Sequence, residues 1–281
     1  MRFAKGHGTG NDFVVVPDFD DELEMTPDLA AALCDRHFGV GGDGVLRVVR
    51  SAAAGEGQPA EWFMDYRNAD GSMAEMCGNG VRVFARYLIE EGLAQGPEIA
   101  VGTRAGTRTI RVEPDGQLTV DMGSAVVLGD GSADASGRLL SGLAISVGNP
   151  HLACMVDEPV SAVDLSAPRL LGPDGLAGGA NIEIVRLVGE HEIEMRVHER
   201  GSGLTLSCGT GAVAAAVVAA ATARQWPFPR ARWIVHVPGG TLAVTPGVTA
   251  SLLTGPAEII ARGELAAGWA GRHSPVGLGT A

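Results

Sequence analysis

Two copies of one short pattern limit the fold of this chain more than any other feature of its sequence. The first copy is MCGNGVRVFARYL at residues 76–88, and the second is SCGTGAVAAAVVA at residues 207–219. In each copy a cysteine stands directly before Gly-x-Gly, and a helix-forming segment follows. Cys77 and Cys208 should therefore each lie at a helix N-terminus.

The repetition extends to both sides of the two cysteines, which are 131 positions apart (208 − 77). The same offset places Met64 on Met195 and Asn68 on Glu199. Longer segments also match, and these pairs are 8–18 with 146–157 and, more loosely, 101–112 with 237–246. The chain is therefore interpreted as a duplicated unit with one thiol per copy. If the copies face each other, the two thiols meet across a cleft.

A thiol at a helix start has an unusual electrostatic environment. Unsatisfied N–H groups and the positive end of the helix dipole favour negative charge, so a bound carboxylate would find hydrogen-bond donors there. The same field should lower the pKa of each thiol by one or more units from about 8.5. Most free cysteines are instead small buried residues. Two copies in matching contexts favour a chemical role for Cys77 and Cys208.

Composition narrows the class of protein. The chain has 281 residues, of which 46% are hydrophobic and 19% charged, as in a soluble globular protein with two domains of ordinary size. A net charge of −12 argues against nucleic acid as a partner. The four cysteines include no CxxC pair, so no metal site is expected.

Neither a leader nor a membrane span is expected. The N-terminus has no long apolar stretch, and we expect a reducing cytoplasm. Residues 201–223 carry no charge, but their first half suits a loop and helix start and the apolar part from Ala212 is too short to span a bilayer. A buried helix is the better interpretation.

Several further elements are expected along the chain. We expect a strand at 14–16, a helix at 27–36 capped by Thr26, and a strand at 62–66 that ends in a turn. In the helix after Cys77, the spacing predicts Val81, Phe84 and Leu88 in the core, with Arg82 and Arg86 on a more exposed side. Strands are also expected at 180–185 and 194–198.

Two glycine-rich segments receive separate interpretations. GVGGDG at 39–44 mimics part of a nucleotide-binding fingerprint, but no strand clearly precedes it and no strong helix follows, so a loop near the active site is expected. Residues 123–138 are rich in Gly, Ser, Ala and Asp and are predicted to link the halves. The expected domains are 1–126 with Cys77 and 127–264 with Cys208. A last segment, 265–281, is expected to pack back on the N-terminal half or to be partly disordered.

Two opposed thiols suit inversion at a carbon, because one can remove a proton from one face while the other delivers a proton to the opposite face. The carbanion beside a carboxylate needs electrostatic stabilisation in a water-poor site. The candidate amide donors are Gly78, Asn79, Gly209 and Thr210.

Each thiol also needs a partner to control its proton. The candidates are His151 and Glu199. The alternatives are that His151 is a structural histidine and that Glu199 forms a surface ion pair with Arg200. Asn11 and Asn149 recur in both halves and should line the cleft. The candidates for holding the far end of a substrate are Arg200, Asn68, Asn149 and Asn181.

The sequence resembles the diaminopimelate epimerase family over nearly its whole length. The motifs that carry the resemblance are GTGNDF, YRNADGS, MCGNGVR, GNPH, N-x-E, and ERGxG followed by SCGTG. It implies an α/β fold of two pseudo-symmetric, duplicated domains, each a mixed sheet wrapped around a central helix, with the active site in the cleft between them. It further implies a cofactor-independent homodimer that interconverts LL- and meso-diaminopimelate in lysine and peptidoglycan precursor synthesis.

By position, the resemblance implies a role for each candidate residue. Cys77 and Cys208 become the acid/base pair, with Cys77 taking the proton from the LL isomer, and His151 and Glu199 become their helpers. The implied substrate contacts are Asn11, Asn68, Asn149, Asn181 and Arg200, and the carboxylate donors are Gly78, Asn79, Gly209 and Thr210.

Two departures leave other functions open. Many members have GxGET before the second cysteine, where this chain has Gly203-Leu204-Thr205, and residues 176–180 replace the common Phe-Pro-x-Gly-Val. A paralogue that acts on a related amino acid is therefore one alternative. A proline-type racemase is another, although histidine commonly replaces Asn79 there. A non-catalytic amino acid binding protein is the third, and the thiol pair argues against it.

Overall fold

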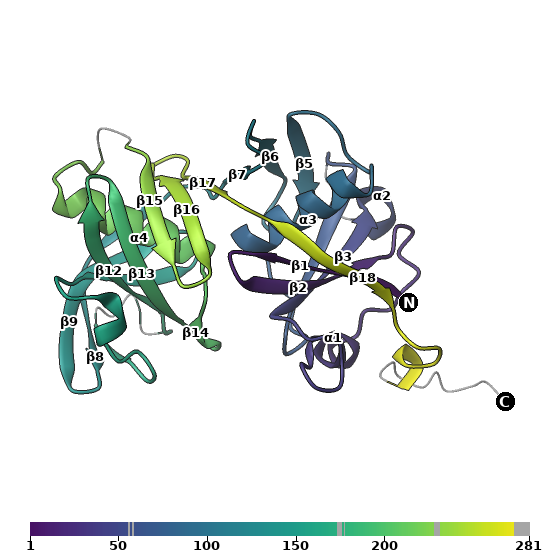
Figure 1. Cartoon of the computed structure of the whole chain (residues 1–281), viewed down its shortest axis with the longest axis horizontal. Coiled ribbons are helices and arrows are strands. Elements are labelled where there is room, and N and C mark those ends of the chain that lie inside the picture. The colour runs from purple at the N-terminus through teal and green to yellow at the C-terminus, as the bar shows by residue number, and fades with distance from the viewer. Residues whose placement is uncertain (56, 58, 173–175, 177, 228–230, 273–281) are drawn as a thin grey trace. The chain divides into compact units, whose positions relative to one another are not determined.

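The computed structural model describes residues 1–55, 57, 59–172, 176, 178–227 and 231–272. The chain forms two compact units: the first comprises Met1–Leu118 and Ala257–Ala281, and the second comprises Thr119–Pro256. The chain therefore passes between the units twice. Figure 1 shows that the yellow C-terminal strand β18 lies beside the purple β1 of the first unit.

The first unit is a mixed sheet with three helices. In spatial order its strands are β18 (Glu258–Glu264), β1 (Arg2–Gly8), β2 (Asn11–Pro17), β3 (Gly44–Arg50), β4 (Trp62–Asn68), β5 (Glu98–Gly102) and β6 (Arg108–Val112). Two of the pairings, β2 with β3 and β4 with β5, are parallel, and the others are antiparallel. The helices are α1 (Pro27–Cys34), α2 (Ser51–Ala54) and α3 (Gly78–Glu90), and a 3-10 turn, η3, covers Ala270–Arg272.

Local sequence explains the helices of this unit. Thr26 Oγ1 accepts a hydrogen bond from Leu29 N at 3.2 Å, and Pro27 occupies the first turn, so the predicted cap of α1 is confirmed. Cys34 is buried in the core beside Leu29 and Leu33, and burial raises the pKa of its thiol to about 12. Cys34 therefore serves packing, as expected from its position in the helix.

Helix α3 is covered on several sides. It packs against β1, β2, β3, β4, β5 and β18, and its residues Val81, Phe84 and Leu88 are fully buried as predicted. The prediction for Arg82 is wrong, because its side chain is also fully buried. Helical spacing predicts one exposed side, whereas here the sheet wraps around the helix.

The second unit is also a mixed sheet, and its longest helix is α4 (Gly209–Thr222). The strands are β8 (Val126–Ala135), β9 (Arg138–Ser146), β10 (Pro150–Met155), β11 (Arg169–Gly172), β12 (Asn181–Gly189), β13 (Glu192–Glu199), β14 (Gly203–Thr205), β15 (Trp233–Val237), β16 (Gly240–Thr245) and β17 (Leu252–Gly255). Strand β7 (Leu118–Asp121), where the chain leaves the first unit, pairs with β17, and a 3-10 turn, η1, covers Val160–Ala162. Helix α4 packs against β9, β10, β12, β13, β15 and β16, and Figure 1 labels it among these strands.

The two units repeat one arrangement. In the first, β2 pairs in parallel with β3, and β3 pairs antiparallel with β4, whose chain leads to α3. In the second, β10 pairs in parallel with β12, and β12 pairs antiparallel with β13, whose chain leads through β14 to α4. The predicted α/β fold with duplicated domains is confirmed.

Residues 123–138 do not form the predicted link. Most of them belong to β8, which pairs with β9 and β11. Its residues Val126–Gly131 are largely exposed, so small and polar side chains suit this strand even though they are typical of a loop.

The compact units differ from the expected halves 1–126 and 127–264. Residues 257–264 belong to the first unit because β18 pairs with β1, and the chain enters the second unit at Thr119. After β18, Leu265 N donates to Met1 O at 2.9 Å, and Leu265 and Trp269 pack on the core around α1. The disorder considered for the end of the chain concerns residues 273–281, which lie outside the described residues.

Within the described parts of the chain, no helix has the length and apolar character needed to cross a membrane. The uncharged segment 201–223 contains α4, a buried helix of 14 residues. The interpretation of this segment as a buried helix is confirmed.

Candidate active site

The two cysteines of the repeated pattern are the N-caps of their helices, as predicted. Cys77 precedes α3 with φ −138° and ψ 124°, and its Sγ accepts from Gly80 N at 3.4 Å. Cys208 precedes α4 with φ −126° and ψ 119°, and its Sγ accepts from Gly211 N at 3.4 Å. The two thiols therefore have the same backbone setting, with the N–H groups of a first helical turn beside them.

In the first unit, Asn11 and Asn79 lie beside Cys77. The Asn11 side-chain oxygen is 3.7 Å from Cys77 Sγ and accepts from Asn79 Nδ2 at 3.2 Å. The Asn11 amide nitrogen donates to Asp43 Oδ2 at 2.7 Å, and Arg36 holds Asp43 at 2.8 Å. The loop before β3 thus fixes Asn11 with its oxygen toward the thiol.

Arg82 supplies a buried positive charge one turn along α3. Its Nη1 donates to Gly78 O at 3.1 Å, and its Nη2 donates to Asn79 Oδ1 at 2.9 Å. Burial lowers the pKa of Arg82 to about 10, while attraction to Cys77 acts in the opposite direction. Arg82 therefore remains a cation at neutral pH. The sequence reasoning missed it because it placed this side chain on the more exposed side of the helix.

In the second unit, Cys208 is buried and lies beside a carboxylate. Its Sγ is 3.5 Å from Thr210 Oγ1, and it hydrogen-bonds with Glu199, whose Oε1 also accepts from Thr205 Oγ1 at 2.5 Å. Burial raises the pKa of Glu199. The Cys208 thiol acts on the pKa of Glu199, the role of Glu199 as a helper of this thiol stays a prediction, and Thr205 is a further partner of this carboxylate.

The pKa of Cys208 is shifted in the direction opposite to the prediction. Burial, followed by the negative charges of Glu199 and Glu183, raises it well above its ordinary value. A helix N-terminus contributes only about 0.3–1 kcal/mol in favour of a negative charge at exposed sites. Burial and two carboxylates outweigh that contribution, so the expected stabilisation of this thiolate is wrong.

His151 lies on β10, completely buried. Its Nδ1 is 2.7 Å from Glu183 Oε1, and its Nε2 is 2.9 Å from Asn149 Oδ1. Both ring nitrogens therefore have partners within the second unit, and neither partner is a thiol. A direct role of His151 at a thiol stays a prediction.

Glu183 is a buried residue to which sequence reasoning gave no role. It stands on β12, two residues after Asn181, and no part of its surface is exposed. The signal that could have identified it is the N-x-E motif at residues 181–183. A buried carboxylate is costly, so Glu183 is a further candidate for a role in the site.

The remaining candidates lie at strand ends and in a turn. Asn181 Oδ1 accepts from Arg200 N at 2.9 Å, and Arg200 Nη1 donates to Gly178 O at 3.1 Å. A pocket of about 570 Å³ in the second unit is lined by Ala180, Ile182, His198, Arg200 and Gly201 among others. Asn68 ends β4 and donates to Ser72 Oγ at 3.0 Å within its turn.

The predicted site residues therefore form one group in each unit. In the first unit, Asn11, Cys77, Gly78 and Asn79 lie together, and Asn68 lies in a turn of its own. In the second unit, Cys208 and Thr210 lie together and Cys208 acts on the pKa of Glu199. His151 contacts Asn149 directly, and Asn181 contacts Arg200.

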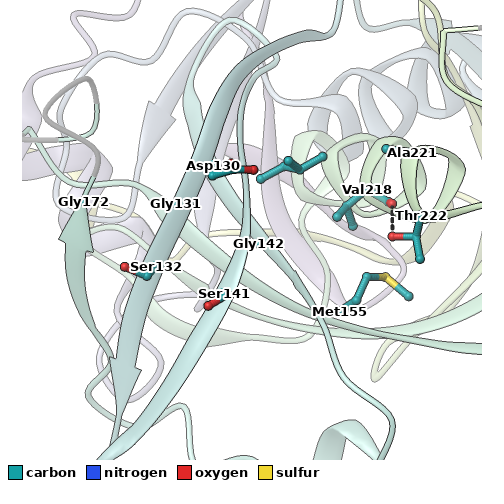
Figure 2. Close-up of a pocket in the computed structure, with 11 residues that line it drawn as sticks. Asp130, Gly131, Ser132, Ser141, Gly142, Met155, Gly172, Val218, Ala221 and Thr222 are labelled. Carbon is teal, nitrogen blue, oxygen red and sulfur yellow. Dashed lines mark hydrogen bonds between the residues drawn. The ribbon is translucent and has the colours of Figure 1, made fainter. Parts of the chain in front are cut away.

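A larger pocket, of about 710 Å³, lies elsewhere in the second unit (Figure 2). Its lining includes Asp130, Ser132, Met155 and the last turn of α4, where Thr222 Oγ1 donates to Val218 O at 2.9 Å. None of the predicted site residues lines it. Among the residues that the structure describes, no group of three or more His, Cys, Asp or Glu side chains could hold a metal ion.

Comparison with solved structures identifies the fold. A probable proline racemase from Agrobacterium radiobacter K84 superposes with a TM-score of 0.66 at 13% identity, over 95% of this chain and 93% of that chain. A PhzF-family phenazine biosynthesis protein from Bacillus anthracis gives a TM-score of 0.64 at 18% identity, over 94% and 98%. These similarities concern the fold alone.

Comparison of sequences identifies the family. The sequence model of the family described as diaminopimelate epimerase matches residues 3–128 and 143–260. A diaminopimelate epimerase of Thermobifida fusca is 57% identical over 94% of this chain and 98% of its own length, and one of Mycobacterium tuberculosis is 48% identical over 96% and 98%. The resemblance carried by the motifs is confirmed. The chain therefore belongs to the diaminopimelate epimerase family, a family of isomerases.

Proposed function

We propose that this protein interconverts LL- and meso-diaminopimelate by proton transfer between two cysteines and the substrate α-carbon, without a cofactor. The observation that supports this most directly is that Cys77 and Cys208 have the same N-cap geometry in two duplicated units. The identity to curated relatives of the same name supports the choice of substrate. Lysine and peptidoglycan precursor synthesis is then the corresponding pathway.

In the proposed reaction, one cysteine acts as a base and the other as an acid. A thiolate removes the α-proton, so the C–H bond breaks and an S–H bond forms. The second thiol then gives its proton to the opposite face of the carbon, which inverts the configuration. The proposal requires both thiols to reach the same carbon. Its only directional expectation is that Cys77 takes the proton from the LL isomer.

The helix starts would stabilise the carbanion. The N–H groups of Gly78 and Asn79 precede the first hydrogen bonds of α3, and those of Gly209 and Thr210 have the same position in α4. These donors suit a carboxylate on which charge develops when the α-proton leaves. The proposed contacts for the rest of the substrate are Asn11, Asn68, Asn149, Asn181 and Arg200, and the proposed helpers of the thiols are His151 and Glu199.

The decisive experiment is incubation with LL-diaminopimelate in heavy water, with the isomer ratio and α-deuteration followed together. The intact protein should form the meso isomer with deuterium at the inverted carbon. Cys77→Ala and Cys208→Ala should each lower the rate of interconversion by at least about 10³-fold, because each removes one of two obligatory proton carriers. Full activity of either variant would end the two-thiol account.

The alternatives give different results in the same experiment. A proline-type racemase would exchange the α-proton of proline with solvent but not that of diaminopimelate. A non-catalytic binding protein would bind the amino acid without deuterium uptake. The relatives favour neither alternative. We also propose a homodimer in the cytoplasm, and sedimentation analysis of the purified protein measures the oligomeric state.

A further inference from the structure

A chain of hydrogen-bonded side chains runs past Cys77 in the first unit. It starts at Arg82, whose Nη2 donates to Asn79 Oδ1 at 2.9 Å. Asn79 Nδ2 then donates to Asn11 Oδ1 at 3.2 Å. Asn11 Nδ2 in turn donates to Asp43 Oδ2 at 2.7 Å. Every bond therefore has the same direction, from a cation through two amides to a carboxylate.

The two ends of this chain differ in kind, and the difference fixes both amides. A guanidinium group can only donate, and an ionised carboxylate can only accept. Asn79 must therefore turn its oxygen toward Arg82, and Asn11 must turn its NH2 group toward Asp43. If Asn11 alone turned over, its NH2 group would face that of Asn79 and its oxygen would face a carboxylate. Only one orientation of each amide satisfies every bond in the chain.

The cationic end is itself held in place. Arg82 is fully buried, and its Nη1 donates to Gly78 O at 3.1 Å. A methyl group added to Gly8, at the end of β1, would lie 3.2 Å from Arg82 Nη2. The guanidinium group thus lies between the first turn of α3 and the end of β1, where it has little room to move.

The carboxylate end is held by a second cation and by the main chain. Asp43 Oδ1 accepts from Arg36 Nη2 at 2.8 Å, and its Oδ2 also accepts from Asp12 N at 3.2 Å. Asp43 N donates to Asp12 O at 2.7 Å. The carboxylate is therefore fixed beside the start of β2, which carries Asn11.

The backbone of Asn11 is fixed by a tight turn. Asn11 pairs with Gly8 at the end of the β1–β2 hairpin, and Thr9 and Gly10 connect the two strands. Both connecting residues have positive φ, 49° for Thr9 and 82° for Gly10, as a type I′ turn requires. The position of Asn11 thus comes from the hairpin, and the orientation of its amide comes from the chain of hydrogen bonds.

The second unit has no equivalent chain on its helix. Val213 occupies the α4 position that corresponds to Arg82, and α4 contains no charged residue. Asn149, the counterpart of Asn11, has its oxygen 2.9 Å from His151 Nε2. An imidazole nitrogen can donate or accept, so it does not impose one orientation on an amide in the way that a guanidinium group does.

We propose that Arg82 and Asp43 are positioning residues that together hold the amide oxygen of Asn11 beside the Cys77 thiol, where it receives the ammonium group of the substrate. The inference rests on the proposed function, which places an amino acid at this thiol. Cys77 Sγ donates to Asn11 Oδ1 at 3.7 Å, so this oxygen is within reach of a donor on the thiol's side. An amide oxygen has two lone pairs, and Asn79 uses one of them.

The orientation of this amide separates the two charged groups of an amino acid. The oxygen of Asn11 attracts an ammonium group and repels a carboxylate. The N–H groups at the start of α3 attract a carboxylate and repel an ammonium group. A substrate that binds both is held with one orientation about its α-carbon, which is what selective removal of the α-proton requires. Neither Arg82 nor Asp43 contacts the substrate in this arrangement.

The test compares the effect of one substitution, Asp43→Asn, in two proteins. In the intact protein it should raise KM for LL-diaminopimelate by about tenfold, because an asparagine here cannot turn an oxygen toward Asn11 and Arg36 at the same time. In the Asn11→Asp variant, two carboxylates face each other and KM is already raised. There Asp43→Asn should lower KM by about tenfold, because the new NH2 group donates to the carboxylate at position 11.

This change of sign distinguishes positioning from a merely structural role. A carboxylate that only stabilises the loop before β3 would, when replaced, harm both proteins. Recovery of binding with a carboxylate at position 11 also requires that the group received there is a donor. If Asp43→Asn does not improve the Asn11→Asp variant, the inference is overturned.

A second pair of substitutions tests the cationic end. Arg82→Met keeps the length of the side chain and removes its donors, so it should raise KM by about tenfold and change kcat by less than about threefold. Arg82→Lys keeps a donor and should recover most of the binding. Urea unfolding establishes that each variant is folded. An unchanged KM in folded Arg82→Met would overturn the role of Arg82, and the comparison at Asp43 does not depend on this variant.

Matched controls remove a charge next to each end. Asp12→Asn takes away a carboxylate that binds the same Arg36, at 2.8 Å, and Lys5, at 2.6 Å. Arg86→Met takes away a cation one turn further along α3, where Arg86 donates to the main chain at Ala257 and Gly116. Neither control should change KM by more than about twofold.

The outcome is separable from that of the proposed function. Absence of α-deuteration of diaminopimelate by the intact protein would overturn the function. An intact protein that epimerises diaminopimelate, together with an Asn11→Asp variant that Asp43→Asn does not improve, would overturn only the positioning of Asn11.

Discussion

The starts of α3 and α4 have the same backbone and opposite electrostatics. Each has a cysteine N-cap that accepts from the N–H of the third following residue at 3.4 Å. Cys77 has a buried arginine on its helix, whereas Cys208 has Glu183 and Glu199 around it. Duplication thus preserved the geometry of the cysteine N-cap, while the surrounding side chains of the two copies differ.

The same contrast holds for the carboxylates on the corresponding strands β4 and β13. Asp65 of β4 is buried among cations: its Oδ2 accepts from Arg47 Nε at 2.9 Å, and its Oδ1 accepts from Arg67 Nε at 3.0 Å and from Arg104. Burial opposes its charge, but Arg104 and Arg67 lower the pKa of Asp65 below its ordinary value. Burial instead raises the pKa of Glu199 on β13. The environment of Asp65 favours the charged form of the carboxyl, whereas that of Glu199 disfavours it.

The largest expected effect that separates these carboxylates is on stability. Asp65→Asn should lower the free energy of unfolding by about 3–5 kcal/mol, because it removes the buried counter-charge that Arg47, Arg67 and Arg104 share, although Arg47 keeps Asp18 and Asp21 as partners. Glu199→Gln should lower it little, because burial disfavours the charge of Glu199 and raises its pKa. Guanidinium unfolding at neutral pH measures both. Equal losses in the two variants would contradict the contrast.

The pH dependence of the free energy of unfolding should also depend on Asp65. A carboxyl whose pKa is lowered in the folded state contributes stability above its unfolded pKa of about 3.9 and loses it as the pH falls toward the folded value. The free energy of unfolding of the intact protein should therefore decrease on acidification below about pH 4. In Asp65→Asn this decrease should be smaller, because the variant lacks the carboxyl whose pKa is lowered. Urea midpoints measured between neutral and acidic pH test the difference, and parallel curves for the two proteins would exclude Asp65 as a main source.

Matched glycine substitutions compare the two helix starts directly. Gly211→Ala would place a methyl group 2.8 Å from Glu183 Oε1, which His151 holds in place, and 3.2 Å from Cys208 Cβ. It should cost about 1–3 kcal/mol of stability. Gly80→Ala meets Cys77 Cβ at 3.3 Å and apolar atoms at 3.4–3.5 Å, and alanine is the better helix former, so its net cost should stay below about 1 kcal/mol. Thermal or urea unfolding of both variants gives the comparison, which fails if Gly80→Ala is the more damaging.

The sequence predicted the features that depend on neighbouring residues. A cysteine before Gly-x-Gly is sufficient to place an N-cap, and Thr26 before Pro27 is sufficient to place the start of α1. The buried charges depend on pairing between distant strands. Glu183 reaches α4 only because β12 pairs with β10, and Arg82 is buried only because strands cover α3 on several sides. Helical spacing carries no signal for that coverage, so Arg82 was assigned to the wrong environment.

The composition of β8 gave a similar error. Its segment GDGSADA at 129–135 resembles a linker, yet it pairs with β9 along its whole length. Hydrogen bonds of the main chain hold the exposed part of this strand, while Ala133 and Ala135 are buried in the core. A boundary between duplicated domains is therefore poorly predicted from glycine and serine content, whereas the repeated motifs around the cysteines predict the duplication well.

The smallest effect that we expect concerns Thr205 and its counterpart in the first unit. Thr205 Oγ1 donates to Glu199 Oε1, whereas Asn68, at the position that corresponds to Glu199, donates to Ser72 Oγ in an exposed turn. Thr205→Val should remove one donor from a buried carboxylate, costing about 1 kcal/mol of stability and up to about tenfold in kcat. Ser72→Ala should change stability by less than about 0.5 kcal/mol, because water replaces the lost partner.

Thr205→Ser keeps the donor and should retain most of the activity lost in Thr205→Val. Because the hydroxyl lowers the pKa of Glu199 against the effect of burial, its removal should also move the pH–rate profile of kcat toward higher pH. Steady-state kinetics across pH for the three variants measure the shift. A lower kcat in Thr205→Val without a shifted profile would mean that Thr205 only shapes β14, and the two carboxylate environments would then differ less than their geometry indicates.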